Sequence, residues 1–510
     1  MEPDAEAVIR LTSINSFWDG LGWMPVIVRI ENRADRARTW NVEFTANSYH
    51  IHSVTVRTPA TITVPARGMS ETFVLVAGAG RSESANWTTP LMVQVSGPGV
   101  VARGMNLTSS REVNFGLIAY SPAADLPVKR MTGPLPSTGG PPAYEFQPVN
   151  PSQWPADWRV WSSFSSIVMT GDEYDALDGA RRTALKEWVA QGGNLLLDRR
   201  EPLPAEANSI AVGQGRIHNR SYNLRTVAKS NPRHRIEPWL SVTELLNDDD
   251  RADWALSKPV MALIIFLVVF GIVVGPVNVF FLAPASRRQR LFWTVPVLSV
   301  GASLMLGGLI LVKDGFGGEG TRRALVMLMP GENKAVVFQQ QIARTGVLLR
   351  REFALPADTM LSVSGRGGTS GVNAVRELER AGDKAGGAWF ASRTTQSHDL
   401  RRITPTRARV ELVAGGTAGE APVVQSSMTT VLRNFRYADM RGRRWIAEEL
   451  PPGRRVTLTQ TDTTDTGDRA GVFRAYGGAS DLAPLATHAS ITWRDDSILY
   501  TGRVEAASQP

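Results

Sequence analysis

The chain has 510 residues, 43% of them hydrophobic and 20% charged, which is the composition of a globular protein of about three domains and excludes collagen, a coiled coil and general disorder. The absence of cysteine excludes disulfides, iron–sulfur clusters, thiolate zinc sites and a cysteine nucleophile. The net charge of +8 comes from scattered arginines and not from a basic stripe interleaved with aromatics, so nucleic acid is not an expected partner.

Residues 1–114 are expected to form a β-sandwich. Short runs in which apolar and polar residues alternate, such as AVIRLTS, WNVEFTA and ETFVLVA, recur with turn residues between them. His50 and His52 lie two positions apart on one face of such a strand, as a pair of metal ligands would. A closed metal site needs three or four ligands and the sequence offers no third, so we interpret both as surface histidines.

Residues 115–245 change to an α/β pattern. The apolar run SSIVMT ends at Thr170, an acidic turn follows, and ALKEWVA then carries apolar residues at helical spacing. Gly192 and Gly193 end this helix, and NLLLD is the next strand. A strand, a helix and a second strand in this order predict neighbouring parallel strands.

Two uncharged segments in the middle of the chain predict a pair of transmembrane helices, at 259–283 and 291–312. Each is long enough to supply the roughly 20 apolar residues that a helix needs to cross the hydrocarbon core. The loop between them, 284–290, carries three arginines: Arg287, Arg288 and Arg290. By the positive-inside rule, this loop is expected in the cytoplasm.

With this topology both large parts of the chain, 1–258 and 321–510, lie outside the cytoplasmic membrane. The first part must then be translocated, yet residues 1–30 show no basic segment followed by an apolar one. We therefore expect that a signal peptide has been removed or that the natural start lies upstream of residue 1.

Each predicted span has a pair of small residues four positions apart, Gly271 and Gly275 in the first and Ser303 and Gly307 in the second. Such pairs let helix backbones approach closely. They either join the two spans of one chain or recruit the span of a partner, and the sequence leaves both possibilities open. Asn278 is polar at membrane depth and is expected to form a hydrogen bond between helices.

Two stretches of the chain are familiar. The run from Ile167 to Leu197 resembles the class I glutamine amidotransferase-like domain of bacterial membrane proteins, and the turn at 213–216 looks like the next G-x-G turn of that domain. GPVNVFFL at 275–282, with the arginine loop and LFWTVPVLS after it, resembles the membrane hairpin of the same uncharacterised family. True amidotransferases use a cysteine on a strand-to-helix elbow. Since this chain has none, the resemblance implies a degenerate, non-catalytic module for binding or assembly.

Residues 321–510 are again β-rich and are expected to form a sandwich or a jelly-roll-like domain close to the membrane. Runs such as ALVMLMP, ARVELVAG and RVTLTQT are the candidate strands, and 364–388 is expected to be a loop. Asp462, Asp465 and Asp468 lack the spacing of an EF-hand. We interpret them as a polar turn and not as a calcium site.

The C-terminal part also carries most of the charge excess, with 26 basic and 19 acidic residues. One interpretation is a weak attraction to anionic lipid headgroups or envelope polymers. The other is an ordinary solvated surface rich in arginine.

The chain contains no P-loop, HExxH or GxSxG motif. A serine nucleophile in the α/β part would need a histidine within reach, and neither His218 nor His234 has a recognisable partner. Trp154, Trp158 and Trp161 cluster in QWPADWRVW, where they stack on sugars or pack one region against another. We favour packing and expect no catalytic residue, no cofactor and no bound metal.

The sequence as a whole predicts a multidomain membrane protein with a β-sandwich, an α/β part with a mostly parallel sheet, two transmembrane helices and a C-terminal β-sandwich. The leading hypothesis for its function is a non-enzymatic envelope scaffold or accessory subunit of a membrane complex. Its partners are then the lipid bilayer and other membrane or envelope proteins. One alternative is an extracytoplasmic protein that binds envelope glycan or another anionic polymer. The other is a serine- or metal-dependent hydrolase.

Overall fold

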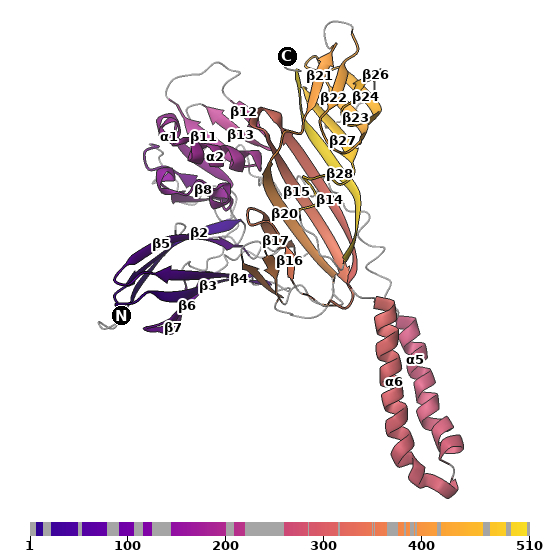
Figure 1. Cartoon of the computed structure of the whole chain (residues 1–510). Helices are drawn as coiled ribbons and strands as arrows, with labels where there is room; N and C mark the ends of the chain where they lie inside the picture. Colours follow the sequence, from indigo (N-terminus) through magenta and orange to yellow (C-terminus); the bar gives the residue numbers. More distant parts are fainter. Residues whose placement is uncertain are drawn as a thin grey trace, which may run out of the picture.

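The computed structural model describes residues 7–13, 22–48, 54–78, 91–106, 116–124, 144–199, 209–219, 260–283, 285–314, 317–348, 350, 352–364, 376–381, 384–387, 392, 395–415, 420–462, 470–485 and 491–506. These residues form four β-sheets and a helical hairpin that projects away from the sheets (Figure 1). The protein is therefore β-rich, with several sheets and two long apolar helices.

The N-terminal part is built from two antiparallel sheets. One contains β1 (Ala7–Ser13), β2 (Trp23–Asn32) and β5 (Met69–Ala77). The other contains β3 (Arg38–Ser48), β4 (Val54–Val64), β6 (Leu91–Gly97) and β7 (Val100–Asn106). Alternate residues of these strands are buried, among them Val28 and Ile30 of β2 and Trp40 and Phe44 of β3. The strands predicted for this part are thus present, with their apolar residues in one core.

Three strands from the C-terminal part extend this second sheet: β16 (Glu352–Ala354), β18 (Arg376–Ala381) and β19 (Lys384–Gly386). β18 runs parallel to β4, with Arg376 opposite Val54 and Leu378 opposite Val56. The expectation of a loop over 364–388 is therefore wrong for β18 and β19. The sequence of β18, RELERA, has no apolar alternation that predicts a strand. Its extended conformation is set by backbone pairing with β4 and with β19.

The α/β part contains a six-stranded sheet. Five of its strands are parallel: β8 (Gly116–Tyr120), β9 (Tyr144–Pro148), β10 (Ser166–Thr170), β11 (Asn194–Asp198) and β13 (Gly215–Asn219). The sixth, β12 (Ser209–Val212), is an antiparallel edge strand, and the order is β9-β8-β10-β11-β13-β12. The parallel pairing expected between the strands at SSIVMT and NLLLD is present as β10 and β11.

Four short helices accompany this sheet: η2 (Pro151–Gln153), η3 (Trp158–Trp161), α1 (Gly171–Ala176) and α2 (Gly179–Ala190). α2 connects β10 to β11 and buries Leu185, Trp188 and Val189, which belong to the apolar helical pattern of the sequence. A Lys334–Glu187 ion pair of 2.5 Å links α2 to the C-terminal sheet.

The C-terminal part forms one branched twelve-stranded sheet. Its main path is β17 (Met360–Ser364), β20 (Thr395–Pro405), β15 (Lys334–Thr345), β14 (Gly318–Met329), β28 (Ile491–Ala506), β27 (Val472–Gly477), β23 (Leu432–Ala438), β24 (Arg444–Leu450) and β26 (Thr459–Thr461). The branch is β21 (Val410–Ala414), β22 (Val423–Ser426) and β25 (Arg455–Thr457). The long β28 pairs with β14 and β27 and also with β21, which connects the branch to the main path.

The middle of this sheet buries polar side chains. The Gln339 amide donates to Gln341 Oε1 at 2.9 Å, and the Gln341 amide lies 3.2 Å from His398 Nδ1. Gln339 Oε1 also accepts from the backbone N–H of Leu485 at 2.7 Å. These hydrogen bonds compensate the desolvation of the amides, and the contact between Gln341 and His398 joins β15 to β20.

The hairpin consists of α5 (Val260–Ile272), the π-helical segment η6 (Val273–Leu282), the turn η7 (Ala285–Arg290) and α6 (Leu291–Asp314). Its two helices, Ile264–Leu282 and Arg287–Gly308, are long and apolar enough to cross a membrane. Pro276 lies inside η6. Because proline has no N–H to donate, the regular α-helical ladder cannot continue through this residue.

Candidate functional site

Three parts of the chain meet around the ring of Trp23, the first residue of β2. Trp23 is 4% exposed, and its backbone N–H donates to Ser162 Oγ of the α/β part at 2.8 Å. The guanidinium carbon of Arg159 lies 5.1 Å from the centre of the Trp23 ring, and that of Arg380 of β18 lies 4.8 Å from it. We call these four residues the Trp23 junction. It joins the N-terminal sandwich, the α/β part and the C-terminal part.

Arg380 is the most constrained member of the Trp23 junction. It is buried, and its guanidinium donates to the carbonyl oxygens of Pro356 and Ala357 at 3.1 and 3.2 Å. Burial and the like charge of Arg159 lower the pKa of Arg380 to about 10, although Asp358 acts to raise it. The cation–π contact with Trp23 and the two carbonyls therefore offset the desolvation of a charged group.

The tryptophans singled out in the sequence lie next to this junction. Trp154, Trp158 and Trp161 are all buried, and the rings of Trp154 and Trp161 stack with their centres 4.0 Å apart. Arg159, between Trp158 and Trp161, donates to both carboxylate oxygens of Asp157. The cluster is an internal packing element of the α/β part, and its rings present no face to a sugar.

The small residues of the hairpin are uncovered. A Cβ atom placed on Gly271, Gly275 or Gly307 would meet nothing within 4 Å, and Ser303 is exposed. These residues therefore do not pack the two helices of one chain against each other. Asn278 is fully buried, but its side-chain amide has no hydrogen-bond partner in the described part of the chain, so the expected hydrogen bond between helices is absent.

The three arginines of the predicted cytoplasmic loop, Arg287, Arg288 and Arg290, lie in η7 and are exposed. This turn between the two helices lies at the end of the hairpin that is farthest from the sheets (Figure 1).

The carboxyl ends of β8 and β10 carry a small polar cluster. After β8 the chain continues to β9 on one side of the sheet, and after β10 it continues to β11 on the other side. The carboxyl ends of β8 and β10 therefore form a topological switch point, which is where parallel sheets usually bind ligands. The Ser121 hydroxyl donates to Glu173 Oε1, and the Thr170 hydroxyl donates to Glu173 Oε2 at 3.0 Å. Thr170 Oγ1 also accepts from the backbone N–H of Glu173 at 3.1 Å, which completes a capping box on α1.

An ion pair between Arg199 and Asp175 lies at the same edge of the sheet, next to the carboxyl end of β11. Arg199 follows β11 and donates to both carboxylate oxygens of Asp175 on α1, at 2.9 and 3.2 Å. These hydrogen bonds to Asp175 raise the pKa of Arg199, and desolvation of the guanidinium opposes this effect. The Ser121 and Thr170 hydroxyls are thus bound to Glu173, and Asp175 is bound to Arg199.

The remaining candidates do not form a site. His218 lies on β13 opposite Leu196, and Asp462 is exposed after β26. His50, His52, His234, Asp465 and Asp468 lie outside the described residues. Within the described ranges no group of three histidine, aspartate or glutamate side chains could hold a metal ion.

Sequence reasoning missed the Trp23 junction and the Ser121–Glu173 contact, because both depend on residues far apart in the chain. The one local signal was the sequence of Thr170 and Glu173, three apart after an apolar strand, which is the pattern of a capping box.

No family model and no curated protein matches this chain. Among solved structures it is similar over 20% of its length to red sea bream transglutaminase, at 16% identity and a TM-score of 0.15, and it spans 16% of that enzyme. The yeast delta-COP-I mu-homology domain matches over 37% of this chain and 96% of its own length, at 6% identity and a TM-score of 0.21. A Paenibacillus cycloisomaltooligosaccharide glucanotransferase matches over 37% and 27%, at 9% identity and a TM-score of 0.17.

Proposed function

We propose that this protein is a non-enzymatic scaffold or accessory subunit of a membrane complex, anchored in the cytoplasmic membrane by its hairpin. The observation that carries the proposal is the uncovered small-residue face of the hairpin at Gly271 and Gly275. Helices with such a face associate by close backbone packing. Because the second helix of the same chain does not cover this face, a helix of a partner is the natural occupant.

The topology belongs to the same proposal. Exposed arginines at the hairpin tip favour a cytoplasmic tip, with the sheets outside the membrane. The Trp23 junction holds three parts of the chain in one arrangement, as a scaffold requires.

The α/β part is, in this proposal, a degenerate amidotransferase-like module. Its strand-to-helix elbow is Thr170–Gly171, where an amidotransferase would carry its cysteine. The Thr170 hydroxyl is engaged in the capping box, and the Ser121 hydroxyl is bound to the same carboxylate. Among the described residues no imidazole holds either hydroxyl, which argues against hydrolase chemistry at this edge. Burial of the three clustered tryptophans also gives little support to a glycan-stacking function.

The experiment is a pull-down of the tagged full-length protein, solubilised in detergent from its native membrane and analysed by mass spectrometry. We expect membrane proteins in stoichiometric amounts with the wild type, and their loss when Gly271 and Gly275 are both replaced by leucine. The matched control replaces Ile265 and Val269, which are exposed on the same helix but point away from the face of Gly271 and Gly275, by leucine and keeps the partners. The proposal fails if the wild type purifies alone, or if the Gly271→Leu and Gly275→Leu variant keeps the same partners and the same fold.

A further inference from the structure

One face of the C-terminal sheet carries a row of arginines, contributed by four neighbouring strands. Arg436 of β23 lies directly opposite Arg474 of β27. Arg503 of β28 is opposite Val472, two residues from Arg474, and Arg444 of β24 is opposite Ala438, two residues from Arg436. Since residues two apart on a strand share a face, all four arginines lie on the same side of the sheet. We call these four residues the arginine row.

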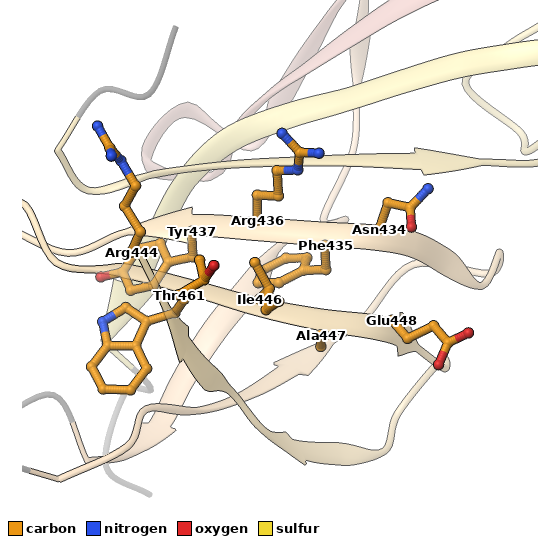
Figure 2. A pocket seen from close by; sticks show the side chains of 10 residues that line it. Asn434, Phe435, Arg436, Tyr437, Arg444, Ile446, Ala447, Glu448 and Thr461 are labelled. Atoms are coloured by element: carbon orange, nitrogen blue, oxygen red, sulfur yellow. The ribbon is translucent and has the colours of Figure 1, made fainter. Parts of the chain in front are cut away.

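The spacing within the arginine row is short. Directly opposite residues have Cβ atoms about 5 Å apart, and diagonal neighbours about 7–8 Å apart. Figure 2 shows the side chains of Arg436 and Arg444 extending from the same side of the β23–β24 pair. Among the described residues, Arg474 and Arg503 form no ion pair. Arg474 and Arg503 are diagonal neighbours of like charge, so this pair favours an anionic partner.

The arginine row borders two hollows on this face. One, of about 280 Å³, is lined by Arg436, Arg444 and Ile446 and also by the acidic Glu448 (Figure 2). The other, a groove of about 600 Å³, is lined by Arg474 and Arg503 and runs between the sheet and the β12–β13 turn of the α/β part. Because Arg436 and Arg474 are neighbours, the arginine row connects the two hollows.

The groove has an apolar side and an acidic end. Met329, Val472 and Leu499 line it and are partly exposed. Glu505, two residues beyond Arg503 on the same strand face, and Glu332 of the turn η8 (Pro330–Glu332) line it as well. The groove therefore changes from basic to acidic along its length.

We propose that this groove and the arginine row bind an extended peptide segment of a partner protein that carries acidic and apolar side chains. Guanidinium groups pair with carboxylates through two parallel hydrogen bonds, and a methionine-containing apolar surface adapts to different side chains. Glu332 and Glu505 would repel a uniform polyanion that filled the groove.

The proposal does not depend on the hairpin, so it can fail while the proposed function of the hairpin stands. The test uses full-length protein in detergent micelles and a fluorescent hexapeptide in which glutamate and leucine alternate, measured by anisotropy. In an extended conformation this probe places its carboxylates on one side and its leucines on the other. The control probes are the same peptide with lysine in place of glutamate, and a heparin oligosaccharide.

We expect saturable binding of the glutamate–leucine peptide that weakens as salt is raised, because exposed charge pairs are screened. The variant with Arg474→Gln and Arg503→Gln should bind at least about tenfold more weakly, as expected when two charge contacts are lost. A variant with Arg10→Gln and Arg454→Gln, which removes the same charge from exposed positions outside the groove, should bind like the wild type.

Three results would overturn the proposal. The first is no saturable binding of the acidic peptide, or equal binding of the lysine peptide. The second is unchanged affinity in the Arg474→Gln and Arg503→Gln variant while its circular dichroism matches the wild type. The third is binding of heparin without binding of the peptide, which would assign the arginine row to a glycan.

Discussion

The Trp23 junction depends on one glycine, and replacing Gly22 by alanine should open it. Gly22 has φ +70°, in the left-handed region, and a Cβ atom there would lie 2.4 Å from the backbone carbon and oxygen of Ser162. Two backbones cannot both keep their positions at that distance. The start of β2 would have to move away from η3 and lose the 2.8 Å bond from Trp23 N–H to Ser162 Oγ.

The magnitude follows from these contacts. An alanine in the left-handed region costs about 1–2 kcal/mol, and a lost hydrogen bond about 1 kcal/mol. The junction should therefore open about 2–3 kcal/mol more easily, which corresponds to about 30- to 150-fold faster local hydrogen exchange. The assay is hydrogen–deuterium exchange by mass spectrometry on the full-length protein in detergent, read in peptides that cover 22–32 and 158–165.

Gly179→Ala is the matched control, because it makes the same chemical change at a position where a Cβ atom meets nothing within 4 Å. Gly179 is the first residue of α2, so this variant should exchange like the wild type or slightly more slowly. The steric argument is refuted if the Gly22→Ala variant exchanges at the junction at the wild-type rate, or if its change is no larger than that of Gly179→Ala.

Three further outcomes are expected. Trp161→Ala removes a fully buried ring stacked on Trp154 and should lower the free energy of unfolding by about 3–5 kcal/mol, seen as a lower thermal midpoint; an unchanged midpoint would contradict its role in the core. Thr170→Ala removes the capping hydroxyl and should destabilise α1 by about 0.5–2 kcal/mol, measured as faster exchange in 170–177, whereas slower exchange would argue against the cap. Burial raises the pKa of Asp439, but hydrogen bonds from Arg443 and Trp445 prevail and leave it below its ordinary value of 3.8. The β23–β24 hairpin should therefore keep its exchange protection above that pH and lose it as the pH falls further; Asp439→Asn should remove this acid-induced loss, and a loss that persists would assign it to another group.

Helices and strands with a clear pattern in a short stretch of sequence could be predicted from the sequence. The hairpin follows from two uncharged segments, and α2 from apolar residues at helical spacing before Gly192 and Gly193. The strands of the sandwich follow from their alternation, since one face of each is buried. In all these cases the pattern within about twenty residues is enough to choose the conformation.

Pairings between distant segments could not be predicted, because no local pattern records them. RELERA becomes β18 through its backbone bonds to β4, more than three hundred residues earlier, and to the adjacent β19. Asn278 looked like one half of a hydrogen bond between helices, yet sequence alone cannot say whether a partner group stands opposite. The groove could not be predicted either, because its two sides come from distant segments: the β12–β13 turn on one side, and β14, β27 and β28 on the other.

The pairing of β18 with β4 also limits how the chain can be divided. β4 has β3 on one side and β18 on the other, so a piece that ends before the hairpin would expose a row of unpaired backbone N–H and C=O groups along β4. It would also leave the Trp23 ring without Arg380, which comes from the same strand. The N-terminal part and the C-terminal part therefore meet through two contacts that lie close together. One is the pairing of β4 with β18, and the other is the contact of Trp23 with Arg380. The parts on the two sides of the hairpin in sequence are therefore one structural unit.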